Sequence, residues 1–207
     1  MNANTASPWP ISFTSAIDHK RDRSQTCEGG GLLYRAVVPV PSEPARGIRR
    51  ASPDDAAGIV AVLGAVAGER VHSAIDRAWT TEQERRYLET LSPREIVHVA
   101  VDERSEIVGV QILDRWSTLE SMAHVGQLGT FVLAAERRRG VGHQLWNATL
   151  PFARQAGYRK VVIQVRSGNA PAQAFYQGIG FRECGRLGRQ VVIDGQEDDE
   201  LLMELFL

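Results

Sequence analysis

Runs of β-branched and other apolar residues from position 96 onward predict a series of strands. Ile96–Asp102 and Ile107–Leu113 are two such runs separated by a short polar turn, which is typical of a β-hairpin. Val125–Leu133 and Lys160–Arg166 are further strand candidates. The apolar segment Leu201–Leu207 is expected to form a last strand.

Apolar residues at helical spacing predict helices before and between these strands. The first helix is expected to start at Ser52–Asp55, because the serine can cap it, the proline needs no donor there and the aspartates favour the positive helix end. The other helix candidates are Thr81–Leu91, Gly142–Ala156 and Ala170–Gln177. We expect Pro151 to kink its helix, because proline removes a backbone hydrogen bond.

The order of these elements favours a mixed β-sheet covered by helices, an α/β sandwich. This body extends from Gly47 to Leu207 and starts with a short strand at Gly47–Ala51. Residues 1–46 are rich in proline, glycine and small polar side chains, so they bury little apolar surface and we expect a flexible N-terminal extension. The alternative is that Leu32–Val40 forms one strand that pairs with the body.

Charge and composition argue against several classes of protein. A formal net charge of −1 over 207 residues gives no indication of a generic binder of nucleic acid or membrane surfaces. Met1–Pro10 lacks the features of a signal peptide, and no uncharged apolar run approaches the roughly 20 residues that span a bilayer. Two distant cysteines, Cys27 and Cys184, favour the reducing cytoplasm. The histidines show no paired metal-ligand spacing, so we expect no metal.

The most specific chemical signal is the segment Arg137-Arg138-Arg139-Gly140-Val141-Gly142, between a predicted strand and a predicted helix. The first turn of a helix has backbone N–H groups without partners and a positive dipole end, so it suits a diphosphate. Glycines let the backbone approach such a ligand, and arginines add charge. The alternative is a solvated basic turn. The segment is neither a Walker loop nor a dinucleotide-binding fingerprint.

Two motifs together resemble those of a known family. Arg137-x-x-Gly140-x-Gly142 after a strand resembles the acyl-CoA loop of the GNAT superfamily of N-acetyltransferases. Val165-Arg166-x-x-Asn169-x-x-Ala172-x-x-x-Tyr176, followed by Gly180-Phe181, is similar to that family's downstream segment. The resemblance implies a GNAT-type mixed, mostly antiparallel sheet flanked by helices, with residues 47–207 as an acyl-CoA N-acyltransferase domain and acetyl-CoA as co-substrate.

The resemblance also implies roles for individual residues. Backbone N–H groups of the loop would bind the CoA pyrophosphate, the preceding strand would pair with pantetheine, and Tyr176 would protonate the departing thiolate. Packing against the sheet is the alternative for Tyr176, and a helix cap alone is the alternative for Asn169. The predicted cofactor-binding residues are Phe131, Val132, Leu133, Arg137, Arg138, Arg139, Gly140, Val141, Gly142, His143, Gln144, Asn169 and Tyr176.

A primary amine must lose a proton before it can attack a thioester, so a proton acceptor is expected. Ribosomal-protein alanine acetyltransferases of this superfamily have a glutamate before the Val-Arg pair, whereas this chain has Gln164. The replacement candidates are His124, Glu120 and His98, with His124 preferred because it lies next to the central strand and has a suitable intrinsic pKa. A structural role is the alternative for His124. The backbone N–H of Val132 is a candidate to stabilise the oxyanion.

The predicted function is transfer of an acetyl group from acetyl-CoA to a primary amine of a small molecule or peptide, in a ternary complex. A non-catalytic acyl-CoA sensor is the alternative. A structural subunit of a homodimer is a third hypothesis, which rests on strand pairing by Leu201–Leu207. The acidic run Glu197–Glu200 is interpreted as a solvated turn, with attraction of a cationic amine as the alternative.

Overall fold

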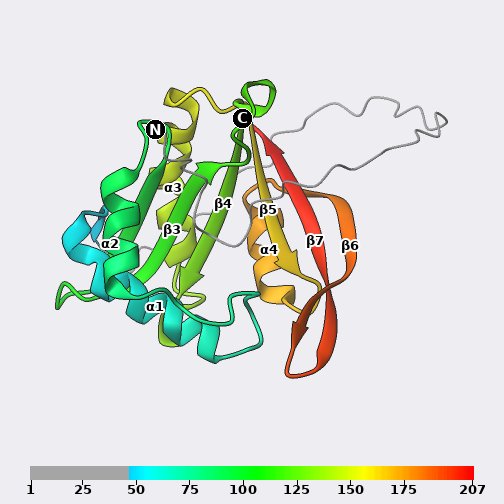
Figure 1. Cartoon of the computed structure of the whole chain (residues 1–207), viewed down its shortest axis with the longest axis horizontal. Coiled ribbons are helices and arrows are strands. Elements are labelled where there is room, and N and C mark those ends of the chain that lie inside the picture. Colours follow the sequence, from blue (N-terminus) through cyan, green and yellow to red (C-terminus); the bar gives the residue numbers. More distant parts are fainter. Residues whose placement is uncertain (1–46) are drawn as a thin grey trace, which may run out of the picture.

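The computed structural model describes residues 47–207, which form a β-sheet with helices on both faces (Figure 1). The predictions for residues 1–46, including the alternative strand Leu32–Val40, lie outside the described residues. The strands are β1 (Gly47–Arg50), β2 (Ile96–Val101), β3 (Ile107–Arg115), β4 (Val125–Val132), β5 (Lys160–Arg166), β6 (Arg182–Ile193) and β7 (Gln196–Phe206). The helices are α1 (Ala56–Gly68), α2 (Thr81–Thr90), α3 (Val141–Gln155) and α4 (Ala170–Gly178), with short 3-10 turns at Pro53–Asp55, Glu120–Met122 and Ala134–Glu136.

The strand order is β1-β2-β3-β4-β5-β7-β6, and the central pair β4–β5 is parallel whereas the other neighbours are antiparallel. The parallel pairing is short, because only Val125–Gln127 of β4 is in register with Lys160–Val162 of β5. Beyond it β4 continues to pair with β3, and β5 continues to pair with β7. The two central strands therefore separate toward their carboxyl ends.

Side chains alternate between the two faces of the sheet, and each face is covered by a different pair of helices. Val97 and Val99 of β2 pack in a cluster with α1 and α2. Ala100 packs with Val141 and Leu145 of α3 on the opposite face. A further cluster joins β5 to α3 and α4 and contains Trp146, Ile163 and Tyr176. The core therefore lies in two layers, one on each side of the sheet.

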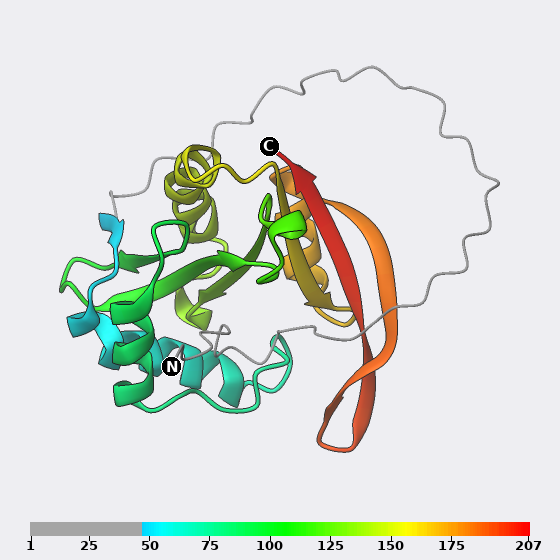
Figure 2. The ribbon, with the colours of Figure 1, turned by 45° about the horizontal axis from the view of Figure 1, so that its top comes forward.

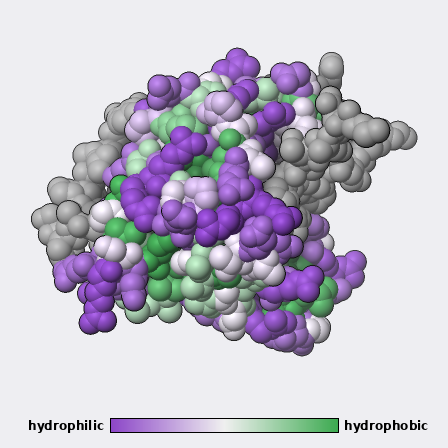
Figure 3. All heavy atoms as spheres, turned by 60° about the vertical axis from the view of Figure 1, so that its left-hand side comes forward, coloured by the Kyte–Doolittle hydropathy of each residue, from purple (hydrophilic) through white to green (hydrophobic). Residues whose placement is uncertain are grey.

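Helix α2 shows how the polar pattern places an element at the surface. Its exposed positions are polar, whereas Tyr87 and Leu88 are buried against the sheet. Figure 3, which brings this side of the molecule forward, shows hydrophilic side chains across the middle of the face. No helix within residues 47–207 is long and apolar enough to cross a membrane.

The predicted fold class is confirmed, and β2 to β5 end within two residues of the predicted positions. Helix α3 remains helical through Pro151. The interpretation of Glu197–Glu200 as a solvated turn was wrong, because these residues lie inside β7, where Glu197, Asp198 and Glu200 pair with β6. Since the segment Glu200–Glu204 of β7 pairs with β5 on one side and β6 on the other, this segment offers no free edge for pairing with a second chain. Figure 2 shows the β6–β7 hairpin projecting past the rest of the sheet.

Candidate active site

A cavity of about 600 Å³ opens where β4 and β5 separate. Because β4 has lost β5 as a neighbour from Leu128 onward, this edge of its backbone is available to a ligand. The lining includes His72–Ile75 of the loop between α1 and α2, Gln127–Val132 of β4, Gly140–His143 at the start of α3, Gln164–Arg166 of β5, Asn169, several residues of α4 and Glu200 of β7.

The start of α3 presents backbone donors to the cavity. Its N-cap residue Gly140 has a φ of 81°, Arg138 has a φ of 59°, and no side chain caps the helix. A helix without a side-chain cap keeps unpaired N–H groups in its first turn, and the helix dipole adds positive potential there. Alternating left-handed residues turn further N–H groups toward the same concavity. This end of the cavity is therefore suited to an anion.

Arg137 has a structural partner rather than a free guanidinium. Its Nη1 and Nη2 atoms donate to the two carboxylate oxygens of Glu69 at 2.7 and 2.6 Å, and its Nε donates to the carbonyl of Val132 at 2.9 Å. The predicted loop is thus anchored to the end of α1. Arg139 is similarly paired with Glu136 at 3.3 Å.

Most of the predicted cofactor-binding residues lie in the cavity wall. Leu133, Arg139 and Gln144 are outside the lining among the described residues. The backbone N–H of Leu133 donates to Val108, and that of Gln144 donates to the carbonyl of Gly140 as part of the helix. The lining contains Phe131, Val132, Arg137, Arg138, Gly140, Val141, Gly142, His143, Asn169 and Tyr176.

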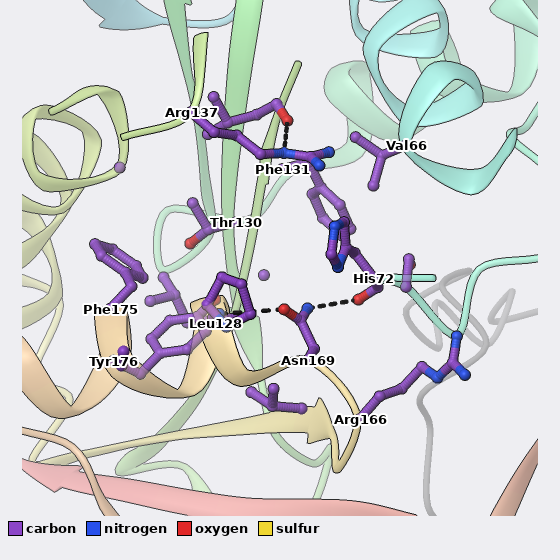
Figure 4. A pocket seen from close by; sticks show the side chains of 18 of the residues that line it. Val66, His72, Leu128, Thr130, Phe131, Arg137, Arg166, Asn169, Phe175 and Tyr176 are labelled. Carbon is purple, nitrogen blue, oxygen red and sulfur yellow. Dashed lines mark hydrogen bonds between the residues drawn. The ribbon is translucent and has the colours of Figure 1, made fainter. Parts of the chain in front are cut away.

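Asn169 connects two walls of the cavity. Its Oδ1 accepts a hydrogen bond from the backbone N–H of Ala172 at 3.1 Å, which caps α4. Its Nδ2 donates to the backbone carbonyl of His72 at 2.8 Å (Figure 4). The residue is buried, so both bonds hold the loop between α1 and α2 against the start of α4.

Tyr176 lies in an aromatic cluster at the wall of the cavity (Figure 4). Its ring packs against Phe175 and Phe181, with centroid separations of 4.9 and 5.5 Å. Burial raises the pKa of the Tyr176 hydroxyl to about 12, although hydrogen bonding with Thr130 of β4 opposes the shift. The phenol therefore keeps its proton at neutral pH.

Close packing joins the starts of α3 and α4. A Cβ atom added at Gly142 would lie 3.1 Å from Cε2 of Phe175, which is closer than ordinary van der Waals contact. The ring of Phe175 also meets His143 edge-on, with centroids 5.1 Å apart. Glycine at position 142 thus allows the aromatic ring of α4 to approach the start of α3 closely.

Glu200, which the sequence placed in an acidic run with attraction of a cationic amine as the alternative, lies at the cavity. Its side chain lines the cavity from β7 and accepts a hydrogen bond from Nε2 of Gln164 at 3.1 Å. Burial and the neighbouring charge of Asp198 raise the pKa of Glu200, while Gln164 and Arg166 oppose the shift. Strand alternation places Glu200 and Leu202 on one face of β7, and the pairing of Leu202 with Gln164 puts that face on the side of Gln164.

The three histidine and glutamate candidates for the proton acceptor lie elsewhere. His124, Glu120 and His98 are absent from the cavity lining within residues 47–207. His124 precedes β4, and its carbonyl accepts from the backbone N–H groups of residues 159 and 160. His98 is buried, its Nδ1 lies 2.9 Å from Oγ1 of Thr149, and burial lowers its pKa to about 4.

Comparisons with known proteins agree on one family. The model of the acetyltransferase (GNAT) family matches residues 68–181, which is more than half of the chain. An L-methionine sulfoximine/L-methionine sulfone acetyltransferase of Pseudomonas aeruginosa is 26% identical over 148 residues, which is 68% of this chain and 82% of the relative.

Solved structures of the same fold support this agreement. An acetyltransferase of the GNAT family from Streptococcus pneumoniae has a TM-score of 0.73 and 26% identity, and the match covers 79% of this chain and 100% of that one. A phosphinothricin acetyltransferase from Sinorhizobium meliloti, solved with acetyl-CoA, has a TM-score of 0.73 and 16% identity, with 78% and 88% covered.

Proposed function

Because the chain belongs to the GNAT family of acetyltransferases, we propose that it transfers an acetyl group from acetyl-CoA to a primary amine that attacks the thioester directly. Both substrates are held in one complex, which lowers the entropic part of the barrier. The observation that carries this proposal is the cavity between the separated strands β4 and β5, with the start of α3 at its wall.

The cavity fits the parts of an acyl-CoA molecule. The pyrophosphate binds the N–H groups at the start of α3, where Gly140 and Arg138 have positive φ values. Pantetheine adds to the free edge of β4 as an extra strand would, along Phe131 and Val132. A backbone N–H of β4, with Val132 as the candidate, stabilises the oxyanion.

Tyr176 donates a proton to the departing thiolate. Its pKa of about 12 keeps the hydroxyl protonated until the sulfur gains negative charge. Burial destabilises a thiolate as well as a phenolate, so the same apolar wall also raises the basicity of the leaving group. Asn169 caps α4 and so positions the helix on which Tyr176 lies. Asn169 also contacts the CoA arm in this proposal.

A thiol-release assay tests the proposal. The acceptor panel contains L-methionine sulfone, L-methionine sulfoximine, phosphinothricin and a short peptide with a free N-terminus, each incubated with protein and acetyl-CoA. We expect CoA release above the rate without amine, and the acetylated amine by mass spectrometry. Binding of acetyl-CoA by calorimetry without acetylation of any amine would instead support the sensor.

A further inference from the structure

Glu200 places a carboxylate in the cavity wall, and neither cofactor binding nor thiolate protonation requires this carboxylate. It lies in β7 between Leu187 of β6 and Arg166 of β5, and only 8% of the residue is exposed. Its Oε2 accepts a hydrogen bond from Nε2 of Gln164 at 3.1 Å. Because β7 is paired on both sides, the backbone around this carboxylate is fixed by the sheet.

The side-chain amide of Gln164 has a carbonyl oxygen that can accept a hydrogen bond close to the Glu200 carboxylate. Its Nε2 is directed to Glu200, and its Oε1 is buried without a hydrogen-bond partner within residues 47–207. An unsatisfied buried carbonyl is costly, so a ligand that supplies an N–H donor at this point is favoured. A primary ammonium group has three such donors, whereas a carboxylate or sulfonyl group has none.

We propose that Glu200 is the catalytic base that takes a proton from the acceptor's ammonium group, which the amide oxygen of Gln164 holds. The inference rests on the proposed acetyl transfer. It identifies the part of the cavity formed by β5 and β7 as the subsite for the amine.

Protons and bonds balance in this scheme. One ammonium proton passes to Glu200, and the neutral nitrogen forms a bond with the thioester carbon. Collapse of the tetrahedral intermediate breaks the carbon–sulfur bond, and the sulfur takes the Tyr176 proton. The nitrogen loses its second proton, which restores the Tyr176 hydroxyl. Glu200 releases its proton to solvent, so each turnover yields an amide, CoA thiol and one proton.

The charges around Glu200 agree with this role. Asp198 lies on the same strand as Glu200, and Arg166 of β5 is paired opposite Glu200. Arg166 is already paired with Asp198 at 2.8 Å and donates to the carbonyl of Arg70 at 3.1 Å. Burial raises the pKa of Glu200, and a carboxylate with a raised pKa is a stronger base.

The test compares Glu200→Gln with Glu204→Gln, using the best acceptor of the panel. Glu204 is equally buried and lies on the same strand, but it pairs with Lys160 and Arg182 and is not part of the cavity lining among the described residues. We expect E200Q to lower kcat about 100-fold at pH 7 with unchanged binding of acetyl-CoA. E204Q should keep kcat close to that of the wild type.

The pH profile separates a base from a structural residue. In E200Q only the amine that is already neutral can react, so its rate should rise about tenfold per pH unit up to the amine's pKa, and its deficit against the wild type should shrink. A deficit that is constant from pH 6 to pH 9, or an unchanged kcat, would overturn the role of Glu200.

A second variant covers the case in which E200Q does not fold. Gln164→Leu removes the amide oxygen, and we expect it to raise KM for the amine without changing the dissociation constant of acetyl-CoA. An unchanged KM would overturn the amine subsite. If the wild type acetylates no amine of the panel, the proposed function itself fails. If the wild type is active and E200Q has the same kcat, only the role of Glu200 fails.

Discussion

The Nδ2 atom of Asn169 donates to the backbone carbonyl of His72 at 2.8 Å, although 97 positions separate the two residues in the chain. This bond joins the start of α4 to the loop between α1 and α2, and both segments line the cavity. The same side chain caps α4 through Ala172. One buried amide therefore fixes two walls of the proposed active site.

Asn169→Ala should lower the free energy of unfolding by about 2 kcal/mol, because it removes a helix cap and leaves a buried carbonyl unpaired. Denaturant unfolding measures this change. Asn169→Asp keeps the oxygen that accepts from Ala172 but replaces the donor to His72 with a carboxylate oxygen, so its loss of stability reports on the contact with His72 together with the repulsion between the two oxygens. An N169A variant as stable as the wild type would show that neither bond stabilises the fold.

Glu69 is expected to affect acetyl-CoA binding although it is not part of the cavity lining within residues 47–207. Its carboxylate holds the Arg137 guanidinium, which in turn bonds the carbonyl of Val132. If Arg137 acts by positioning the loop, Glu69→Gln should weaken acetyl-CoA binding about fivefold, which corresponds to about 1 kcal/mol for a half-buried ion pair. Calorimetric titration measures the affinity.

The alternative to positioning is direct contact between Arg137 and phosphate. In that case Glu69→Gln should leave affinity unchanged or increase it, because the guanidinium is released, while Arg137→Ala should still weaken binding. Glu82→Gln is a suitable control, because Glu82 is an exposed residue paired with Arg86 on α2. The two single variants and their double variant then give the coupling energy of the pair.

Tyr176→Phe should lower kcat about 100-fold and leave the dissociation constant of acetyl-CoA unchanged, because the ring is kept and only the proton donor is removed. Since the hydroxyl has a pKa of about 12, the wild type should show no loss of activity from Tyr176 ionisation up to pH 10. Tyr158→Phe is the matched control: its hydroxyl donates to the carbonyl of Arg94. Equal kcat values for Y176F and the wild type would exclude the proton-donor role.

The sequence predicted the central strands and the glycine-containing loop before α3 because their signals are local. β-branched runs and a glycine-flanked turn before a helix have few alternative interpretations. The resemblance placed a strand start at Gly180-Phe181, next to β6, but the extent of β6 and the first half of β7 were not predicted, because both segments are rich in polar residues. Within residues 47–207, β6 pairs only with β7, and β5, which is distant in sequence, pairs with β7 only from Glu200 onward.

Glu200 was not singled out from the acidic run Glu197–Glu200 for a related reason. Within an acidic run, composition favours a turn, and only the register with Arg166 shows which carboxylate faces the cavity. Arg137 illustrates the opposite case, since its motif was found but its partner Glu69 is 68 positions away. Long-range side-chain pairs leave no pattern in a single sequence, so their roles follow from the fold alone.

Glu84 on α2 is a fully buried carboxyl group whose two oxygens have no hydrogen-bond partner within residues 47–207. Burial, with a smaller contribution from the charge of Asp114, raises its pKa to about 7. The folded state therefore holds a proton that the unfolded state has lost above about pH 4.5. This contribution to stability is complete below that pH and is lost as the pH rises to 7.

Glu84→Gln removes this titration, so the difference in unfolding free energy between E84Q and the wild type should shift in favour of the variant from pH 5 to pH 7, by at most about 1.4 kcal/mol per pH unit. Chemical denaturation at several pH values measures it. Asp55, whose pKa is lowered to about 2 by Arg49, has the opposite pH dependence but is common to both proteins, so it cancels. A difference that does not change with pH would mean that Glu84 is ionised in the fold throughout, and that its buried charge is compensated.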